Sequence, residues 1–378
     1  MFYIVIGSFL GYLSLLNVFF KKKLNVLFGF LSIILVTICS LRYGGGTDYF
    51  SYRYLFYQVP LNIVDAMSHE THLDFGFKML VAIFRSFNMS FELFVAILSI
   101  FIMGCYIYVI NKYSKNKILS IFLLFTNYYL VYVESALRQG LAMSIFIIAY
   151  YKYLQDNNTK KYMIIILIIS LFHKAALIAL IIPLVKIMYY KIGNNLNSNI
   201  MILLGSLLLF LTKGERILIK IAQLIGIKIS YQPGDANIYA ILLRLVLLLI
   251  LYIAYIKSDK DKISDNDKIQ FYTYFINVCL FIAISNNTLF SRITDFISVI
   301  EIIVLANFIS NINIKGLDIL IISSIILIMG ILFIKDISAN NYTGGYYKKG
   351  IFDYPYVSVF DKEKIFKYRS INSLNLQD

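Results

Sequence analysis

The chain has 378 residues, of which 60% are hydrophobic, and its mean hydropathy is +0.75. A soluble domain carries roughly 45–50% apolar residues. This composition therefore excludes an ordinary soluble enzyme and predicts an all-α, polytopic integral membrane protein. The formal net charge of +14 is what Lys and Arg kept on cytoplasmic loops produce, and we favour that interpretation over nucleic-acid binding.

Apolar runs predict roughly ten to twelve membrane-spanning helices, because about 20 residues cross a bilayer. Three lysines, 21–23, follow the first run and indicate the cytoplasmic side, so both chain termini are expected outside. The transmembrane domain is expected to be residues 1–334, followed by an outer tail, 335–378. The expected spans are residues 2–20, 24–41, 91–110, 118–133, 141–154, 162–172, 175–187, 200–211, 238–256, 269–285, 293–309 and 317–334.

Two further segments are expected to lie outside the bilayer. Residues 42–90 form a long outer loop, whose apolar part, 75–87, is too short and too charged to cross. That pattern is typical of a re-entrant or interfacial helix. Residues 213–228 place apolar side chains on one helical face and charged ones on the other. We expect them to lie along the outer membrane surface.

Residues 41–52 combine an arginine, three consecutive glycines, an aspartate and several tyrosines at the end of the second span. The glycines let the backbone adopt positive φ and approach a ligand closely. Arg42 offers a planar fork for phosphate oxygens, and Asp48 adds a carboxylate. A flexible connector with a snorkelling Arg42 and interfacial tyrosines is the alternative, and this stretch alone favours neither.

The expected topology brings charged residues from distant segments to the outer end of the bundle. Arg244 is the most informative, because an arginine inside a span is costly unless it faces a polar cavity or a partner. The alternatives are an ion pair with Asp235 or Glu215 and snorkelling of the side chain to the surface, and we favour the cavity. The complete group is Arg42, Asp48, Asp74, Arg138, His173, Arg244 and Arg292.

Other members of this group also have plain structural alternatives. Arg138 opens a span and is suited to anchoring its end. Arg292 precedes Asp295 by three residues, within reach of an ion pair on one helical face. His173 resembles the many histidines that are satisfied structural groups, although histidine suits general-base work near neutral pH.

The sequence implies neither a metal nor a cofactor. His69, Glu70 and His72 lack the spacing of a helical zinc site and are expected in a solvated loop. The three cysteines each lie inside an apolar run, so we expect them to pack in the core.

Four arginines around one outer site imply a ligand with several negative charges, and a pyrophosphate fits. Access from both the bilayer and the exterior suits a lipid-linked pyrophosphate. The chemistry would be glycosyl transfer, with the lipid pyrophosphate leaving. Asp48 or His173 would deprotonate an acceptor hydroxyl, and the arginines would stabilise charge on the leaving group.

Several of these segments resemble a known family. Residues 42–49, Arg-Tyr-Gly-Gly-Gly-Thr-Asp-Tyr, together with Tyr52, look like the Arg-Tyr-x-x-Gly-Thr-Asp-Tyr signature of the EpsG-type Wzy polymerases. Residues 74–77 look like the acidic-x-Gly-aromatic element of that family, with Asp74 where Glu is common.

The remaining matches follow in order along the chain. Residues 137–142 resemble the Arg-Gln segment of the family, which includes Gln139, and residues 172–176 resemble its Phe-His segment. Arg292 opens a late span, as in the family, and residues 354–356 are similar to its Pro-Tyr ending. Each match is short, but their order and spacing make the set fairly specific.

The resemblance implies a polymerase on the outer face of the bacterial plasma membrane. Such an enzyme moves a growing O-antigen, capsule or exopolysaccharide chain from undecaprenyl pyrophosphate to a new lipid-linked repeat unit. Its partners would be that lipid-linked oligosaccharide and the lipid bilayer, with a chain-length regulator protein as a candidate and no nucleic acid. We expect Asp48, His173 and Asp74 to be catalytic, and Arg42, Arg138, Gln139, Arg244, Arg292 and Tyr52 to bind pyrophosphate or substrate.

Two rival functions stay open. A flippase or transporter of the same lipid-linked sugars would need a cationic cavity with access from both faces. The chain has no matched charged residues in the inner halves of its spans and no two-half symmetry. A membrane O-acyltransferase of polysaccharide would present a histidine within a span or near the cytoplasmic side, whereas His173 is expected outside.

Overall fold

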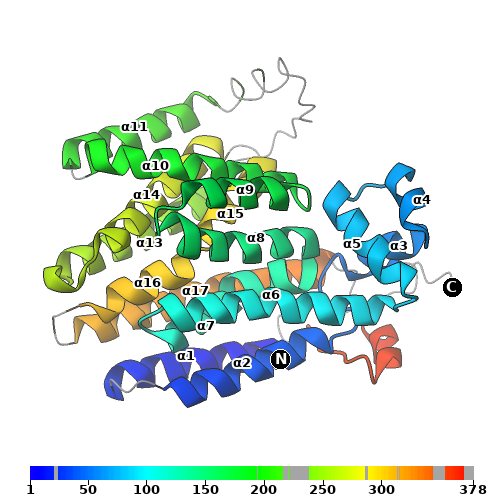
Figure 1. Cartoon of the computed structure of the whole chain (residues 1–378). Coiled ribbons are helices and arrows are strands. Elements are labelled where there is room, and N and C mark those ends of the chain that lie inside the picture. The colour runs from blue at the N-terminus through cyan, green and yellow to red at the C-terminus, as the bar shows by residue number, and fades with distance from the viewer. Residues whose placement is uncertain are drawn as a thin grey trace.

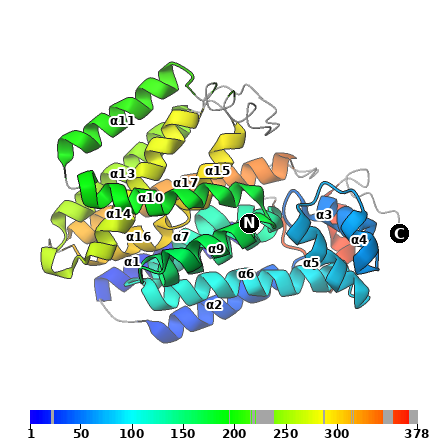
Figure 2. The same cartoon turned by 45° about the horizontal axis from the view of Figure 1, so that its top comes forward.

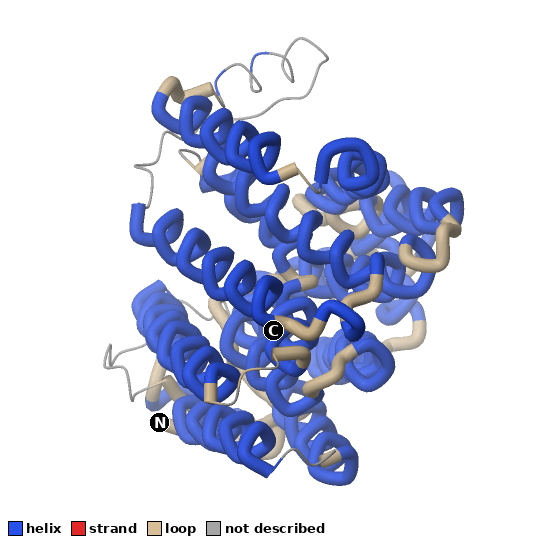
Figure 3. The backbone as a smooth tube through the Cα atoms, turned by 90° about the vertical axis from the view of Figure 1, so that its left-hand side faces the viewer, coloured by secondary structure: helices blue, strands red, loops and turns tan. Residues whose placement is uncertain are grey.

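The structure is a computed structural model that describes residues 1–20, 24–193, 195–214, 216, 220, 238–285, 288–312, 314, 316–343 and 354–369. Within these ranges the chain folds into helices and loops without a β-strand, as the tube in Figure 3 shows. Two isolated β-bridges are present, Arg42 with Ser358 and Ser258 with Ile312. The predicted all-α fold is confirmed.

Within the described ranges, the elements are helices in the following order. The first half contains α1 (Phe2–Phe20), α2 (Asn25–Ser40), α3 (Tyr49–Gln58), α4 (Ile63–Ser68), α5 (Phe75–Ser86), α6 (Phe91–Tyr113), α7 (Lys117–Leu124), the π-helix η1 (Phe125–Ser135), α8 (Leu137–Ala149) and η2 (Tyr150–Leu154). The second half contains α9 (Thr159–Ser170), η3 (Lys174–Ile181), α10 (Ile182–Met188), η4 (Tyr189–Gly193), α11 (Leu196–Leu211), α13 (Ile238–Lys257), η5 (Lys260–Lys262), α14 (Asp265–Ile284), α15 (Thr288–Ser298), α16 (Glu301–Ser310), α17 (Leu317–Thr343) and η7 (Lys362–Lys367).

Each predicted span coincides with helical structure. Five described segments are long and apolar enough to cross a membrane, namely Phe91–Tyr113, Lys117–Ser135, Lys174–Gly193, Ile238–Lys257 and Leu317–Ala339. The short span expected at 175–187 is longer in the structure, because η3, α10 and η4 run on without a break. The predicted surface helix at 213–228 falls almost wholly outside the described residues.

The long helices lie side by side and form one bundle (Figures 1 and 2). The short helices α3, α4 and α5 gather at one end of it, together with residues 354–369. We call this the glycine-rich end, because it holds the glycine-rich stretch, residues 41–52. The predicted non-spanning segment 75–87 is α5, which stands with α3 and α4 at this end.

Buried tyrosines hold neighbouring helices together in the core. The Tyr129 hydroxyl donates to the Leu35 carbonyl (3.0 Å), and the Tyr162 hydroxyl donates to the Ala179 carbonyl (2.8 Å). Each tyrosine buries a large apolar ring while its hydroxyl forms a hydrogen bond, so burial leaves no polar atom of the side chain unpaired.

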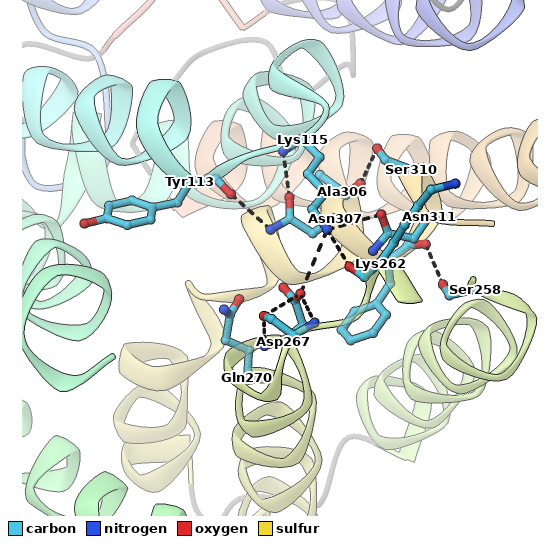
Figure 4. Close-up of polar contacts among 12 residues, drawn as sticks. Tyr113, Lys115, Ser258, Lys262, Asp267, Gln270, Ala306, Asn307, Ser310 and Asn311 are labelled. Carbon is cyan, nitrogen blue, oxygen red and sulfur yellow. Dashed lines mark hydrogen bonds and ion pairs between the residues drawn. The ribbon is translucent and has the colours of Figure 1, made fainter. Parts of the chain in front are cut away.

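Polar contacts tie three loops together (Figure 4). These loops lie at the end of the bundle opposite the glycine-rich end (Figure 1), and we call it the basic-loop end. The Lys115 ammonium donates to the Lys262 carbonyl (3.1 Å) and to Asn311 Oδ1 (3.2 Å), and it lies 3.9 Å from the Asp267 carboxylate. Asn307 accepts from the Lys115 amide (2.7 Å) and donates to the last carbonyl of α6 (3.0 Å). The loops after α6, α13 and α16 therefore hold one another in place.

Candidate functional site

The glycine-rich stretch packs tightly against the end of η1. Gly44 and Gly46 have φ angles of +69° and +85°, a region that strains any other L-residue. A Cβ atom on Gly46 would lie 2.7 Å from the carbonyl oxygen of Glu134. The Thr47 amide donates to Ser135 Oγ (3.0 Å). The stretch is therefore a fixed part of the scaffold and not a loose connector.

Residues 354–369 fasten the same stretch from another side. The Tyr43 amide donates to the Val357 carbonyl (2.7 Å). The Gly46 amide donates to the hydroxyl of Tyr354 (3.0 Å), the first residue of the Pro-Tyr ending. The tail thus contributes to holding the glycine-rich stretch in one conformation.

Arg42 is buried within the scaffold. It is only 1% exposed, and its guanidinium donates to the carbonyls of Cys39, Val133 and Glu134 and to Ser99 Oγ. These contacts join the end of α2 to η1 and α6. The predicted role of Arg42 is a pyrophosphate contact, but both of its Nη atoms are engaged by Ser99 and by backbone oxygens at the ends of α2 and η1. Carbonyls at helix ends lack intrahelical partners, and the guanidinium supplies donors to them.

Asp48 and Tyr52 stand at the beginning of α3, beside Arg138. Thr47 Oγ1 donates to Asp48 Oδ1 (3.0 Å). Arg138 Nε donates to the Tyr52 hydroxyl (3.3 Å), and the guanidinium carbon lies 5.9 Å from the centre of the Tyr52 ring. Burial raises the pKa of Tyr52, so this phenol is neutral at physiological pH.

Asp74 is the point at which three distant segments meet. Arg138 Nη1, on α8, donates to Asp74 Oδ2 (3.2 Å) and to the His72 carbonyl (3.1 Å). His173 Nδ1 lies 3.8 Å from the same Asp74 oxygen. The side chains of Arg138, Asp74 and His173 are 28%, 16% and 24% exposed, so a ligand can reach them. We call Tyr52, Asp74, Arg138 and His173 the Arg138 cluster.

Gly76 explains how Asp74 comes close to His173. The Gly76 amide donates to the Leu171 carbonyl (2.7 Å), and a Cβ atom at Gly76 would lie 2.9 Å from the Leu171 carbonyl carbon. Only glycine allows the first turn of α5 to approach the end of α9 this closely. The glycine of the acidic-x-Gly-aromatic element therefore sets the separation of Asp74 and His173.

A second polar cluster lies between η1, α13 and α15. Arg244 Nη2 donates to Asp295 Oδ1 (2.6 Å), and Arg244 Nη1 donates to Ser298 Oγ (2.7 Å). The Tyr132 hydroxyl donates to Asp295 Oδ2 (2.7 Å). The Arg244 guanidinium also covers the Phe281 ring at 4.2 Å. We call Arg244, Asp295, Ser298 and Tyr132 the Arg244 cluster.

The two clusters are linked through α15. The His173 ring stacks on Phe296, with ring centres 6.4 Å apart and an angle of 15° between the planes. Phe296 follows Asp295 directly in sequence, so the His173 ring packs on the residue next to the carboxylate partner of Arg244. His173 Nδ1 is buried and makes no hydrogen bond to any described residue.

The remaining predicted site residues lie near these clusters without belonging to either. Gln139 follows Arg138 on α8 and is 5% exposed. Arg292 lies on α15 one turn before Asp295, but its side chain falls outside the described part of the chain. The structure therefore assembles Asp48, Tyr52, Asp74, Arg138 and His173 in one place, with Arg244 beside them.

Four contributors to the site were not predicted in these roles, namely Asp295, Ser298, Tyr132 and Ser135. The sequence pattern predicts that Asp295 pairs with Arg292, whereas the structure pairs it with Arg244, 51 residues earlier. Tyr132 and Ser135 belong to no recognisable motif. A usable signal was present for Asp295 alone, since a carboxylate inside a late span requires a cation from another span.

The arrangement can be compared with known proteins. A family model described as the EpsG family matches residues 25–355, a range that contains every residue of both clusters. Neither the curated proteins nor the solved structures give a match to this chain. The matched range covers most of the sequence, and the chain belongs to the EpsG family, the family of Wzy-type polymerases and glycosyltransferases.

Proposed function

We propose that the protein polymerises oligosaccharide repeat units carried on undecaprenyl pyrophosphate, on the outer face of a bacterial plasma membrane. Family membership supports a membrane polysaccharide polymerase or glycosyltransferase. The observation that carries the proposal further is the meeting of Arg138, Asp74 and His173 from three separate segments. A cation, a carboxylate and an imidazole are the groups that glycosyl transfer from a phosphate leaving group needs.

Arg138 and Arg244 supply hydrogen-bond donors to the pyrophosphate in this proposal. Each arginine side chain is partly exposed, and its guanidinium is oriented by one carboxylate, Asp74 or Asp295. A guanidinium fork held in this way can bind two phosphate oxygens with little reorganisation. As the bond from the sugar to the pyrophosphate breaks, negative charge grows on the leaving oxygen, and these fixed donors stabilise it.

His173 is the general base in this proposal, and Asp48 is the alternative. The base takes the proton of an acceptor hydroxyl. The hydroxyl oxygen bonds to the anomeric carbon of the donor sugar while the bond between that carbon and the pyrophosphate oxygen breaks. The Asp74 carboxylate lies 3.8 Å from His173 Nδ1. Its closer approach would hold a proton on Nδ1 and leave Nε2 free to accept the proton of the acceptor hydroxyl.

The contrast between the two ends of the bundle supports a polymerase over a flippase. Both clusters lie away from the basic-loop end. The Arg138 cluster includes Tyr52 of α3 and Asp74 at the start of α5, which are at the glycine-rich end. Arg244 precedes the last residue of α13, Lys257, by more than three helical turns. At the basic-loop end, Lys115 and Asn307 join three loops (Figure 4). A flippase would have to break these contacts to open a second access route, whereas a polymerase needs access from one side.

The test is deletion of the gene in its host, followed by mass analysis of the surface polysaccharide and of lipid-linked oligosaccharides. The proposal predicts loss of long chains while single repeat units are still displayed outside. Repeat units trapped on the cytoplasmic leaflet would instead indicate a flippase. Unchanged chain length with a missing acyl group would indicate an O-acyltransferase.

A further inference from the structure

A polar pocket and an apolar groove adjoin each other at the basic-loop end. The pocket has a volume of about 530 Å³, and its polar lining includes Asn17, Asn25, Lys115, Asn116 and Lys117. The groove has a volume of about 520 Å³ and runs along one face of α2 against α6. Asn25 lines both of them, so the two spaces are neighbours at this residue.

Lys117 occupies the junction of the pocket and the groove. Its ammonium donates to Asn25 Oδ1 (3.0 Å) and to Asn111 Oδ1 (2.6 Å) and lies 5.7 Å from the centre of the Phe28 ring. The residue is half-buried, and no carboxylate in the described ranges forms an ion pair with it. A cation held only by neutral groups is a ready partner for an anion.

The groove has the character of a surface for a hydrocarbon chain. From the Asn25 end it continues past Phe28, Gly29 and Ile33 to Val36, and Ile33 is 66% exposed. A Cβ atom at Gly29 would meet nothing within 4 Å, so this glycine leaves open space beside the helix. A soluble anion would make no use of this apolar lining, whereas a lipid would.

We propose that this junction binds one anionic glycerophospholipid from the leaflet at the basic-loop end. The phosphate bonds to the Lys117 ammonium, an acyl chain lies in the groove past Gly29, and the head group enters the pocket. Asn17 Oδ1 is buried without a hydrogen-bond partner among the described residues, and a head-group hydroxyl supplies the missing donor.

The pocket also contains two other charged groups, Lys115 and Asp318, and the second of them gives a prediction of opposite sign for lipid binding. Lys115 is already engaged by the loop contacts of Figure 4. Asp318, at the beginning of α17, lines the pocket and accepts a hydrogen bond from the Ile319 amide (2.9 Å). Its negative charge opposes an anionic head group, so Asp318→Asn should strengthen lipid binding.

Native mass spectrometry of the purified full chain, titrated with phosphatidylglycerol or phosphatidylcholine, tests the proposal. Phosphatidylglycerol should bind more tightly than phosphatidylcholine, and Lys117→Gln should weaken the binding of phosphatidylglycerol about fivefold. Gly29→Leu should weaken it by filling the groove. Lys112→Gln is the matched control and should change nothing. Lys112 is exposed at the same end, lies over the rings of Tyr108 and Tyr113, and lines neither space.

Three results would overturn the proposal. The first is equal binding of the two lipids, and the second is an equal effect of Lys117→Gln and Lys112→Gln on lipid binding. The third is displacement of the lipid by glycerol phosphate at matched concentration, because that would indicate a site for a soluble phosphate. Lys117→Arg guards against misfolding as an explanation, because it keeps the charge and should retain binding. The readout is bound lipid and not chain length, so this test and that of the polymerase are independent.

Discussion

Arg42 and Arg138 belong to different signature segments at the same end of the bundle, but the structure uses them in opposite ways. The Arg42 guanidinium is buried and serves three carbonyls and a hydroxyl. The Arg138 side chain is 28% exposed and is held by the side chains of Asp74 and Tyr52 and by one backbone carbonyl, that of His72. Backbone carbonyls are held in place by the fold, whereas side-chain partners can change rotamer when a ligand binds. Burial and the number of backbone partners therefore distinguish Arg42, which serves the scaffold, from Arg138, which we propose to bind substrate.

The largest effect that tests this contrast is on stability. Arg42→Ala leaves several buried carbonyls without donors, and we expect a loss of ~3–5 kcal/mol in the free energy of unfolding. Thermal unfolding in detergent can be followed with a thiol-reactive dye, because Cys39, Cys105 and Cys279 are free and buried. Arg138→Ala is the comparison and should unfold near the wild-type temperature. Equal losses in both variants would remove the distinction.

The choice of base gives the next largest effect. If His173 deprotonates the acceptor, His173→Gln should lower the polymerisation rate by about 10²–10⁴-fold while the protein still folds. Asp48→Asn should then lower the polymerisation rate much less than His173→Gln does. The measurement is the rate of chain growth by purified variants with lipid-linked donors. A larger loss in the Asp48 variant would transfer the role of base to that carboxylate.

Gly76 tests whether the separation of Asp74 and His173 matters. In Gly76→Ala the new Cβ would crowd the Leu171 carbonyl carbon at 2.9 Å, so the start of α5 has to shift away from α9. We expect a loss of roughly tenfold in polymerisation, because small misplacements in an active site are costly. Gly104→Ala is the control, since its Cβ would meet nothing within 4 Å. Wild-type activity in both would show that the contact is dispensable.

The smallest effect is expected at the basic-loop end. Lys115→Gln removes the ion pair with Asp267 and two hydrogen bonds of a partly exposed ammonium, to the Lys262 carbonyl and to Asn311. We expect a loss of about 1 kcal/mol in stability. Chain length in a complemented deletion strain should be unchanged, because this end takes no part in the proposed chemistry. A marked change in chain length would mean that the two ends are coupled.

The sequence predicted the helical bundle well, because long apolar runs report directly on the thickness of a bilayer. The runs between residues 162 and 211 were correctly interpreted as helical, although each was short. The resemblance to the EpsG-type polymerases is confirmed by the family match. The proximity of Arg138, Asp74 and His173 at one site was also anticipated from the topology.

The partners of individual side chains were harder to predict. The pairing of Arg244 with Asp295 joins two helices across 51 residues, and no local pattern encodes such a contact. The burial of Arg42 depends on where η1 ends, which hydropathy does not show. The predicted alternatives for Arg244, Asp235 and Glu215, lie outside the described residues.

The central claim is that the Arg138 cluster binds the lipid pyrophosphate. Its most direct test is polymerisation by Arg138→Lys, which keeps the charge but loses the two-pronged donor geometry. We predict about a 10²-fold slower chain growth and an unchanged unfolding temperature. Arg53→Lys, on the same helix as Tyr52 and outside both clusters, should behave like the wild type. Near-normal chain growth in Arg138→Lys would contradict the account.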